Sequence, residues 1–248
     1  MTSERRRFIG SNLKMANDRE STMALLEAAV ELATRDARQF FFFPSMIFVS
    51  EAVQRVAGSP VFIGSQGCSV HRSGAYTGEV SAQMIRDVGA QAVMVGHYER
   101  VVAGESLDLF VAQAARAHEV GLRVLFCLGE REQARNPDAV SDLLSDVAVL
   151  QRRLPDAPWV LAYEPHWAIG EHGTRPESAY VSARLSALRT GLREVGWEHV
   201  PVVYGGSVDS GNAEELDPLA DGLFVGRSAW SPAGLREICT LTQAKERT

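Results

Sequence analysis

Lysine is scarce in this sequence. The 25 basic residues among 248 include only two lysines, Lys14 and Lys245, and the rest are arginine. A sequence with this bias uses arginine wherever either base will serve. Lys14 therefore indicates a position where a compact ammonium group is needed rather than a planar guanidinium.

Cysteine is also rare, and long apolar runs are lacking. Cys68, Cys127 and Cys239 are odd in number and form no CxxC pair, which argues against a disulfide framework or a zinc site. The longest aromatic run, Phe40–Phe43, is far too short to cross a bilayer. The basic residues near the start precede no long apolar stretch. We therefore expect no signal peptide, and a cytoplasmic protein with reduced thiols.

Basic charge is outnumbered by acidic charge, and the formal net charge is −6. A field of this sign repels nucleic acid and anionic membranes, so we expect neither as a partner, and any binding of an anion must be local. Linkers, low-complexity tracts and sequence repeats are lacking as well. Residues 1–248 are therefore expected to form a single domain.

Short apolar runs alternate with segments of helical periodicity along the chain. The expected strands are Phe8–Leu13, Phe40–Phe43, Val61–Ser65, Ala92–Gly96, Val124–Leu128, Val160–Tyr163, Val202–Tyr204 and Gly222–Val225. The expected helices are Arg19–Ala33, Met46–Ala57, Ser81–Val88, Ser106–Val120, Ala139–Arg153, Glu177–Val195, Asn212–Leu216 and Pro232–Leu241. Parallel strands need crossover helices, and strands covered on both faces are apolar throughout. This pattern predicts an α/β fold, the closed (β/α)8 barrel. An open doubly wound sheet is the alternative, but no GxGxxG follows the first run.

Polar residues follow several of the apolar runs directly. Asn12 and Lys14 follow the first run, His97 the fourth and Glu164 the sixth. In a barrel the carboxyl ends of all strands share one rim, and this rim carries the active site. We therefore expect Lys14, His97 and Glu164 to converge, although they are distant in the sequence.

Glycine-rich turns follow the seventh and eighth runs, at Tyr204–Ser207 and Val225–Ser228. Glycines let backbone N–H groups approach an anion closely, and a helix N-terminus adds a favourable dipole. A phosphate site in these two loops recurs in barrels of this type. The turns therefore predict a phosphorylated ligand.

Seven short motifs, taken in order, point to a family. They are Asn12–Met15, Gly74–Glu79, Val95–Arg100, Cys127–Glu130, Leu161–Gly170, Tyr204–Val208 and Asp221–Gly226. With these motifs and their spacing, the chain resembles the triosephosphate isomerase family over essentially its whole length.

The resemblance implies an isomerase of phosphorylated three- or four-carbon sugars. It implies that Glu164 is the base that moves a proton between adjacent carbons and that His97 is a neutral electrophile. Lys14 would be the cation at the enediolate, supported by Asn12. Backbone N–H groups that bind phosphate are implied at Gly170, Ser207, Gly226 and Arg227, and a lid is implied at Pro165–Thr174.

The chemistry of such a reaction agrees with these residue types. An α-hydroxy carbonyl isomerises through an enediolate, and one carboxylate suffices because the two carbons are adjacent. The developing oxyanion needs preorganised donors, which His97 and Lys14 can supply. No hydride or electron moves, so we expect no cofactor, and no metal site is expected either.

Two further features follow from the resemblance. Ile169 and Phe224 are candidates for an apolar clamp over the Glu164 carboxylate, which would strengthen the base by disfavouring its charged form. The long Ser65–Glu79 connection corresponds to a loop that, in the family, inserts into a partner subunit. Thr77 fits the inserted position, so a homodimer is expected.

The sequence departs from the family pattern around the pocket. Leu13 stands where the family usually has Trp, Tyr98 where it has Ser, and Arg227 where it has Gly; His166 lies in the first hinge of the lid. Substrate choice is made in such a region. Relatives with the Gly-Arg-Ser-Ala-Trp loop found here at Gly226–Trp230 resemble isomerases of four-carbon ketose phosphates.

Three functions remain open at this point. The favoured one converts L-erythrulose 1-phosphate to D-erythrulose 4-phosphate, in which case Tyr98 could hydrogen-bond the added hydroxyl group or simply fill space. The alternative is a triosephosphate isomerase. A catalytically silent barrel that binds phosphorylated metabolites is the third, and intact Lys14, His97 and Glu164 argue against it.

Overall fold

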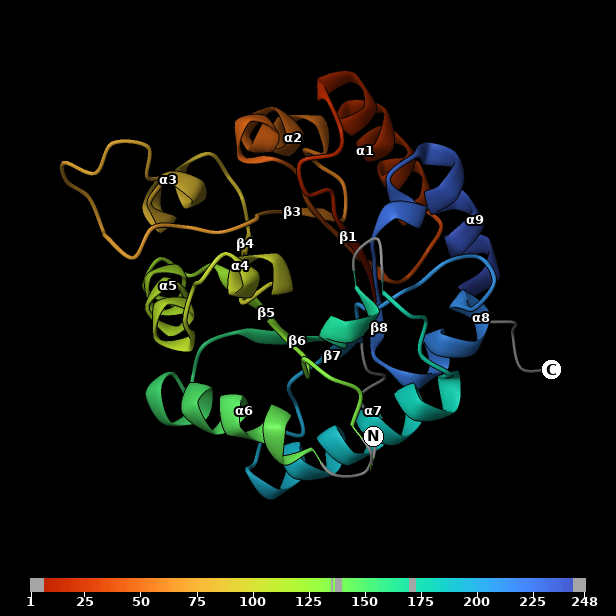
Figure 1. The fold of residues 1–248 in the computed structure, drawn as a ribbon. Coiled ribbons are helices and arrows are strands. Elements are labelled where there is room, and N and C mark those ends of the chain that lie inside the picture. Colours follow the sequence, from red (N-terminus) through yellow and green to blue (C-terminus); the bar gives the residue numbers. More distant parts are fainter. Residues whose placement is uncertain (1–6, 135, 137–139, 170–172, 243–248) are drawn as a thin grey trace, which may run out of the picture.

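A closed barrel of parallel strands forms the centre of the computed structural model (Figure 1), which describes residues 7–134, 136, 140–169 and 173–242. The strands are β1 (Phe8–Asn12), β2 (Gln39–Phe43), β3 (Val61–Ser65), β4 (Ala92–Val95), β5 (Arg123–Leu128), β6 (Trp159–Tyr163), β7 (Val202–Tyr204) and β8 (Gly222–Val225). Each strand pairs in parallel with the next one along the chain, and β8 pairs with β1 to close the barrel. The predicted (β/α)8 barrel is therefore confirmed.

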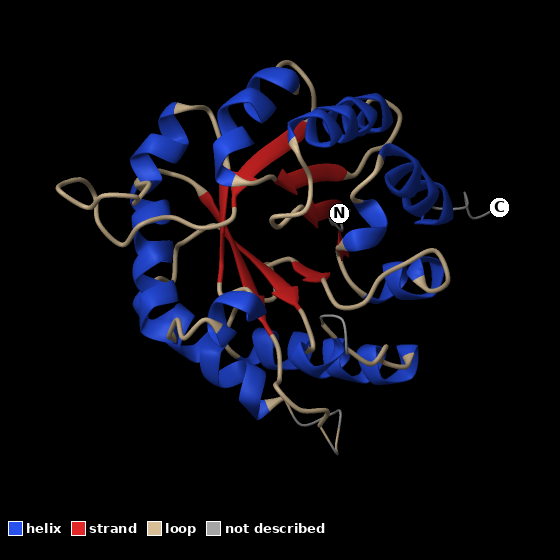
Figure 2. Ribbon diagram, turned by 45° about the horizontal axis from the view of Figure 1, so that its top comes forward, coloured by secondary structure: helices blue, strands red, loops and turns tan. Residues whose placement is uncertain are grey.

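Helices surround the barrel on its outside (Figure 2). They are α1 (Arg19–Ala33), α2 (Val49–Arg55), α3 (Ala82–Asp87), α4 (Tyr98–Val102), α5 (Leu107–Glu119), α6 (Ser141–Arg153), α7 (Ser178–Glu194), α8 (Ala213–Leu216) and α9 (Pro232–Thr242). Short 3-10 helices lie at η1 (Met46–Phe48), η2 (His166–Ala168), η3 (Asp217–Leu219) and η4 (Arg227–Ala229). None of the described helices is both long enough and apolar enough to cross a membrane.

Polar caps fix where several helices begin. The side chains of Asp18, Ser81 and Ser106 each accept a hydrogen bond from a backbone N–H in the first turn, at the starts of α1, α3 and α5. Such a bond satisfies one of the N–H groups that the helix itself leaves unpaired. Helix α4 was not predicted, because its five residues are too few to show a helical period.

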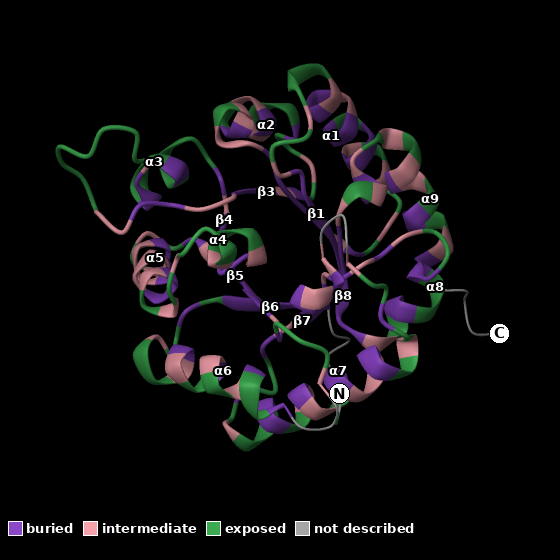
Figure 3. Cartoon of the chain, viewed as in Figure 1, coloured by how far each residue is buried: buried purple, intermediate pink, exposed green. Residues whose placement is uncertain are grey.

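Alternate residues of the strands supply two apolar layers. Ile9, Phe40 and Phe42 belong to the layer between strands and helices, whereas Phe8 and Phe41 belong to the layer inside the barrel. The strands and the inner sides of the helices are buried, as Figure 3 shows. The interior of the barrel is therefore a packed core. Side chains that can reach a ligand lie at the ends of the strands.

Phenylalanine rings fill part of the barrel interior. The rings of Phe41 and Phe224 are stacked at 5.5 Å between centroids, and Phe43 meets Phe224 edge-on at 5.7 Å. Glycines on neighbouring strands leave room for them. A Cβ atom added at Gly10 would lie 2.7 Å from the Phe41 ring, and one added at Gly64 would lie 2.7 Å from Cδ1 of Phe43. The large and small residues thus complement each other across the strands.

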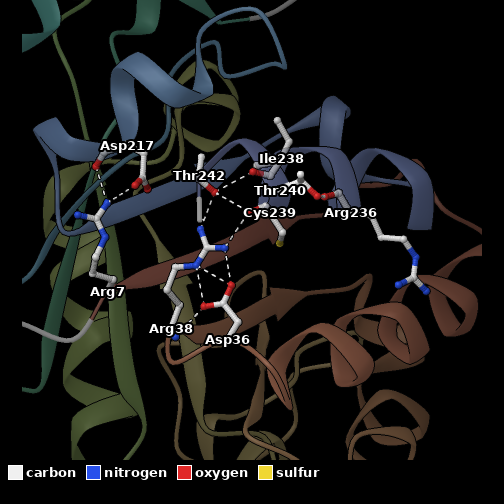
Figure 4. A network of polar contacts seen from close by, with 9 residues as sticks. All are labelled: Arg7, Asp36, Arg38, Asp217, Arg236, Ile238, Cys239, Thr240 and Thr242. Atoms are coloured by element: carbon white, nitrogen blue, oxygen red, sulfur yellow. Dashed lines mark hydrogen bonds and ion pairs between the residues drawn. The ribbon is translucent and has the colours of Figure 1, made fainter. Parts of the chain in front are cut away.

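Polar contacts join the first and last units of the chain (Figure 4). Arg38, just before β2, forms an ion pair of 2.5 Å with Asp36 and donates a hydrogen bond of 2.5 Å to Oγ1 of Thr242 in α9. Arg7, just before β1, pairs with Asp217 of η3 at 2.5 Å. These buried or half-buried arginines link β1 and β2 to the elements that flank β8.

Candidate active site

A cavity of about 340 Å³ opens at the carboxyl ends of the strands. It is lined by residues that follow several of the strands or lie close to their ends: Asn12, Lys14, His97, Glu164, Ile169, Gly205, Gly206, Ser207, Val208, Asp209, Phe224, Val225, Gly226, Arg227, Ser228 and Trp230. Seven of the eight predicted site residues are in this set. The eighth, Gly170, lies outside the described residues.

Lys14 is held in an unusual backbone conformation. Its φ of 51° lies in the left-handed region. Among the described residues other than glycine, Lys14 alone has a positive φ. Hydrogen bonds fix this turn: the Lys14 N–H donates to Oδ1 of Asn12 at 2.9 Å, and the Lys14 carbonyl accepts from Ser45 and Gln66, each at 2.8 Å. Its ammonium group lies 2.8 Å from Oε1 of Glu99. The strained turn thus aims a tethered cation into the cavity.

His97 presents one particular nitrogen to the cavity. It caps α4, and its Nδ1 atom accepts a hydrogen bond of 3.2 Å from the N–H of Glu99, so the proton of the neutral ring is on Nε2. Burial, reinforced by the charge of Lys14, lowers the pKa of His97 to about 4. A neutral imidazole with a free Nε2–H can donate a hydrogen bond to a substrate oxygen at neutral pH.

Glu164 faces His97 across the cavity. Its Oε2 atom lies 3.7 Å from Nε2 of His97 and has no hydrogen-bond partner among the described residues. The side chain is only 2% exposed, and this burial raises the pKa of Glu164 to about 8, although Lys14 acts in the opposite direction. A carboxylate in this environment is a far stronger base than one in water.

The two residues predicted to form an apolar clamp line the same cavity as this carboxylate. Ile169 and Phe224 both line the cavity, and Phe224 is almost fully buried. Cys127 lies on β5, which pairs with the strand that leads to Glu164, and burial together with the nearby Glu164 raises the pKa of its thiol well above the usual value. The thiol is therefore protonated and suited to packing rather than to nucleophilic chemistry.

The loops after β7 and β8 complete the lining of the cavity. Ser207 is fixed by donating to the Ala168 carbonyl at 2.7 Å, and its own carbonyl accepts from Asn212 at 2.8 Å. Gly226 precedes η4, and a Cβ atom added there would meet nothing within 4 Å. Arg227 is exposed at the rim. Gly205, Gly206 and Gly226 carry no side chain, which leaves the backbone of these loops open to an anion.

The structure also places residues that sequence reasoning did not assign to the site. Trp230 lines the cavity and donates from its indole N–H to the Asn12 carbonyl at 2.8 Å, which ties the loop after β8 to the loop after β1. Asp209 lines the cavity and forms an ion pair with Arg175. Trp230 closes the Gly-Arg-Ser-Ala-Trp motif, so that motif was the available signal; nothing in the sequence marked Asp209.

Tyr98 does not line the cavity. Its ring packs instead against His166, with 4.8 Å between ring centroids. Of the two possibilities considered for Tyr98, the packing role agrees with this placement. Within the part of the chain that the structure describes, no three His, Cys, Asp or Glu side chains gather in a way that could hold a metal ion.

Comparisons with known proteins agree with this geometry. The family model described as triosephosphate isomerase matches residues 7–242. An L-erythrulose-1-phosphate isomerase from Rhizobium etli is 38% identical, with 96% of this chain and 92% of the relative covered. A second protein of that name, from Rhizobium rhizogenes, is 36% identical over 100% of this chain and 98% of its own. A triosephosphate isomerase from Hahella chejuensis is 36% identical over 90% and 92%. The chain therefore belongs to the triosephosphate isomerase family.

Proposed function

We propose that this protein is an isomerase that interconverts L-erythrulose 1-phosphate and D-erythrulose 4-phosphate. The observation that carries the reaction type is the pairing of Glu164 with His97. A buried base and a neutral imidazole lie 3.7 Å apart beside the Lys14 ammonium, in one cavity with two glycine-containing loops. This set supplies a proton acceptor, a proton donor, a cation and an anion cradle in one place.

The reaction moves one proton between carbons and one between oxygens. The Glu164 carboxylate removes the proton from C3, the carbon that carries the hydroxyl group, while Nε2–H of His97 and the Lys14 ammonium stabilise the oxygen on C2. The C3–H electron pair becomes the C2–C3 double bond of a cis-enediolate. Glu164 then returns the proton to C2, and His97 relays the hydroxyl proton from one oxygen to the other. No atom is gained or lost.

We assign the phosphate to the loops that follow β7 and β8. Backbone N–H groups at Ser207, Gly226 and Arg227 would hold it, and the same role is proposed for Gly170, which the structure does not describe. Asn12 supports Lys14 through the 2.9 Å hydrogen bond to its backbone. Anchoring the phosphate at a distance from the reacting carbons fixes them against the base, which is the purpose of remote binding energy.

Two observations favour the four-carbon substrate. Several similar full-length relatives carry the name L-erythrulose-1-phosphate isomerase. In addition, Arg227, which departs from the family pattern, lines the cavity. The four-carbon sugar differs from dihydroxyacetone phosphate by one hydroxymethyl group on the reacting carbon, so the same base can act on both. Triosephosphate isomerase activity is the alternative, and the relative from Hahella chejuensis carries that name.

A parallel assay of purified protein decides between the substrates. We expect kcat/KM on L-erythrulose 1-phosphate to exceed that on glyceraldehyde 3-phosphate by at least about a hundredfold, or about 2.7 kcal/mol of transition-state discrimination. The reverse preference would make the protein a triosephosphate isomerase. Absence of turnover on both would leave a silent phosphometabolite-binding barrel.

Shortening the base tests the assigned role of Glu164. In Glu164→Asp the carboxylate withdraws by about one methylene, so we expect kcat to fall by at least about a hundredfold with little change in KM. Glu237→Asp, the same change at an exposed position of α9, is the matched control and should retain wild-type kinetics. An unchanged kcat in Glu164→Asp would remove Glu164 from its proposed role.

We also propose that the protein acts as a homodimer through the Ser65–Glu79 loop. The connection between β3 and α3 extends away from the barrel in Figure 1, and Thr77 within this connection is exposed. Within the loop, the rings of His71 and Tyr76 stack at 3.6 Å between centroids.

Large apolar side chains lie exposed on the loops and short helices after β1, β2 and β4. Met15 after β1 is 95% exposed, Ile47 after β2 82% and Val102 in α4 67%. Exposed apolar groups of this size favour an interface. Sedimentation equilibrium should give twice the chain mass, and Thr77→Asp with Ile47→Asp should give a monomer; a monomeric wild type would refute the dimer.

A further inference from the structure

Two aromatic rings connect the segments that carry the base and the electrophile. Tyr98 directly follows His97 and begins α4, while His166 comes two residues after Glu164 and begins η2. The rings are 4.8 Å apart between centroids and tilted by 32°. Neither residue lines the cavity, so neither is placed to touch the substrate.

The side chain of His166 is held by packing. It is 7% exposed, and its two ring nitrogens have no hydrogen-bond partner among the described residues. Burial lowers the pKa of His166 to about 4, so the ring is neutral under assay conditions. A buried imidazole without polar partners contributes through its shape and its ring contacts. Gly129 packs closely against this ring, because a Cβ atom added at residue 129 would lie 3.0 Å from Cδ2 of His166.

The backbone around His166 is fastened to the end of β5. The N–H of Glu164 donates to the Leu128 carbonyl at 2.8 Å, and the N–H of His166 donates to the Glu130 carbonyl at 2.9 Å. The Glu130 side chain is anchored in turn, since one of its oxygens accepts from Tyr163 at 3.0 Å and from Tyr180 at 2.8 Å. Hydrogen bonds to the end of β5 therefore fix the Glu164–His166 segment on one side. On the side of α4, the Tyr98 ring packs against His166.

We propose that Tyr98 and His166 are positioning residues that set the separation of His97 and Glu164 through the contact between their rings. This inference rests on the proposed isomerase function. The carboxylate of Glu164 has an oxygen without a hydrogen-bond partner in the described structure, so hydrogen bonds alone do not define its distance from His97. The packed rings hold the two segments at a fixed spacing, and proton transfer is sensitive to displacements of about 1 Å.

A double-mutant cycle with conservative variants tests the contact. Tyr98→Phe and His166→Phe keep a ring at each position, and we expect kcat within about threefold of wild type. Tyr98→Ala and His166→Ala remove a ring, and we expect kcat to fall at least about tenfold while KM changes less than about threefold. The double alanine variant should be no slower than the slower single variant, because either deletion alone already breaks the contact.

Two measurements separate positioning from a loss of stability. A substrate deuterated at C3 should show a larger isotope effect in the alanine variants than in wild type, because proton transfer becomes slower. Ile238→Val in α9, a buried residue away from the cavity, lowers the melting temperature without changing kcat or the isotope effect. If an alanine variant does not fold, Tyr98→Leu and His166→Leu remove the ring but keep more of the side-chain volume than alanine does, and are expected to reduce kcat in the same direction.

The outcomes are distinct. Suppose that the wild type is active and that the alanine or leucine variants have the same kcat and isotope effect as the wild type. This outcome would overturn the positioning role and leave the proposed function intact. Independent, multiplicative effects of the two alanine changes would also overturn it. A wild type that isomerises neither sugar would refute the proposed function, and the positioning role with it.

Discussion

Gly205 lies directly against the carboxylate of Glu164. A Cβ atom added at residue 205 would be 2.8 Å from both Cγ and Oε1 of Glu164. The backbone of Gly205 is not left-handed, and its N–H donates to the Tyr163 carbonyl at 2.9 Å, so the absent side chain, not the backbone angle, is what this position requires. Gly205, which directly follows β7, therefore leaves space for the carboxylate of Glu164.

Gly205→Ala should therefore displace the base without removing any catalytic group. We expect kcat to fall by about a hundredfold, because a displacement near 1 Å costs roughly that factor, while KM changes little. Steady-state kinetics provides the measurement. Glu237→Asp, at an exposed position of α9, is the control and should behave like wild type. A fully active Gly205→Ala enzyme would show that the carboxylate need not occupy this position.

The pH dependence of kcat/KM should follow the ionisation of Glu164. Burial raises its pKa to about 8, and the acting form is the carboxylate. His97 remains neutral, because its pKa is lowered to about 4. We therefore expect kcat/KM to rise about tenfold per pH unit below the midpoint and to level off above pH 8. Assays between pH 7 and 9.5 avoid the second ionisation of the substrate phosphate near pH 6. A flat profile over this range would contradict the raised pKa.

The same burial makes the charged base a cost to stability. The pKa of Glu164 is raised from 4.5 to about 8 on folding, so the folded protein holds a proton that the unfolded chain has released. Stability therefore falls as pH rises from about 4.5 to 8. Glu164→Gln removes this loss and should stabilise the protein at pH 9, by on the order of 5 kcal/mol, with the advantage vanishing near pH 4.5. Urea unfolding at both pH values measures it, and Glu237→Gln, at an exposed carboxylate, should show no such pH-dependent gain.

His166 should affect stability on the acid side. Its pKa falls from 6.5 to about 4 on folding because of burial, so between these pH values the unfolded chain binds a proton that the folded protein excludes. Stability is therefore lost as pH falls from 6.5 towards 4. Replacing His166 with Phe keeps the ring and removes this titration, so the variant should gain stability relative to wild type at pH 5 compared with pH 8. Melting temperatures at the two pH values test this, and an equal difference at both would exclude the buried neutral histidine.

Much of the fold and site followed from local sequence. Strands such as Val61–Ser65 and Val202–Tyr204 have the predicted bounds, because short and mostly apolar runs stand out from the helical segments between them. The convergence of Lys14, His97 and Glu164 followed from topology, since a closed parallel barrel places all strand ends on one rim.

Other features depend on contacts between distant segments, which a single sequence does not specify. Neither Tyr98 nor His166 carries a pattern that marks the other as its partner, although both were noted as departures from the family. The left-handed turn at Lys14 was not foreseen, because lysine has no preference for that conformation. Helix α4 was missed for its length. Helical periodicity identifies faces only over several turns.

The complementarity of glycine and phenylalanine inside the barrel gives a prediction about stability. A Cβ atom added at Gly64 would lie 2.7 Å from Cδ1 of Phe43 and 3.0 Å from the Ala92 carbonyl oxygen, and the Gly64 backbone is not left-handed. Gly64→Ala should therefore overpack the interior and lower the free energy of unfolding by about 1–3 kcal/mol. Phe43→Leu should also destabilise the protein, because it leaves a void among the rings. If the clash is with the ring, the double variant should lose less than the sum of the two single losses, since the smaller leucine side chain would give the new methyl group room. Urea unfolding of the wild type, the two single variants and the double variant measures the coupling. Additive losses would show that the methyl group is rejected by the backbone of β4 and not by the phenylalanine ring.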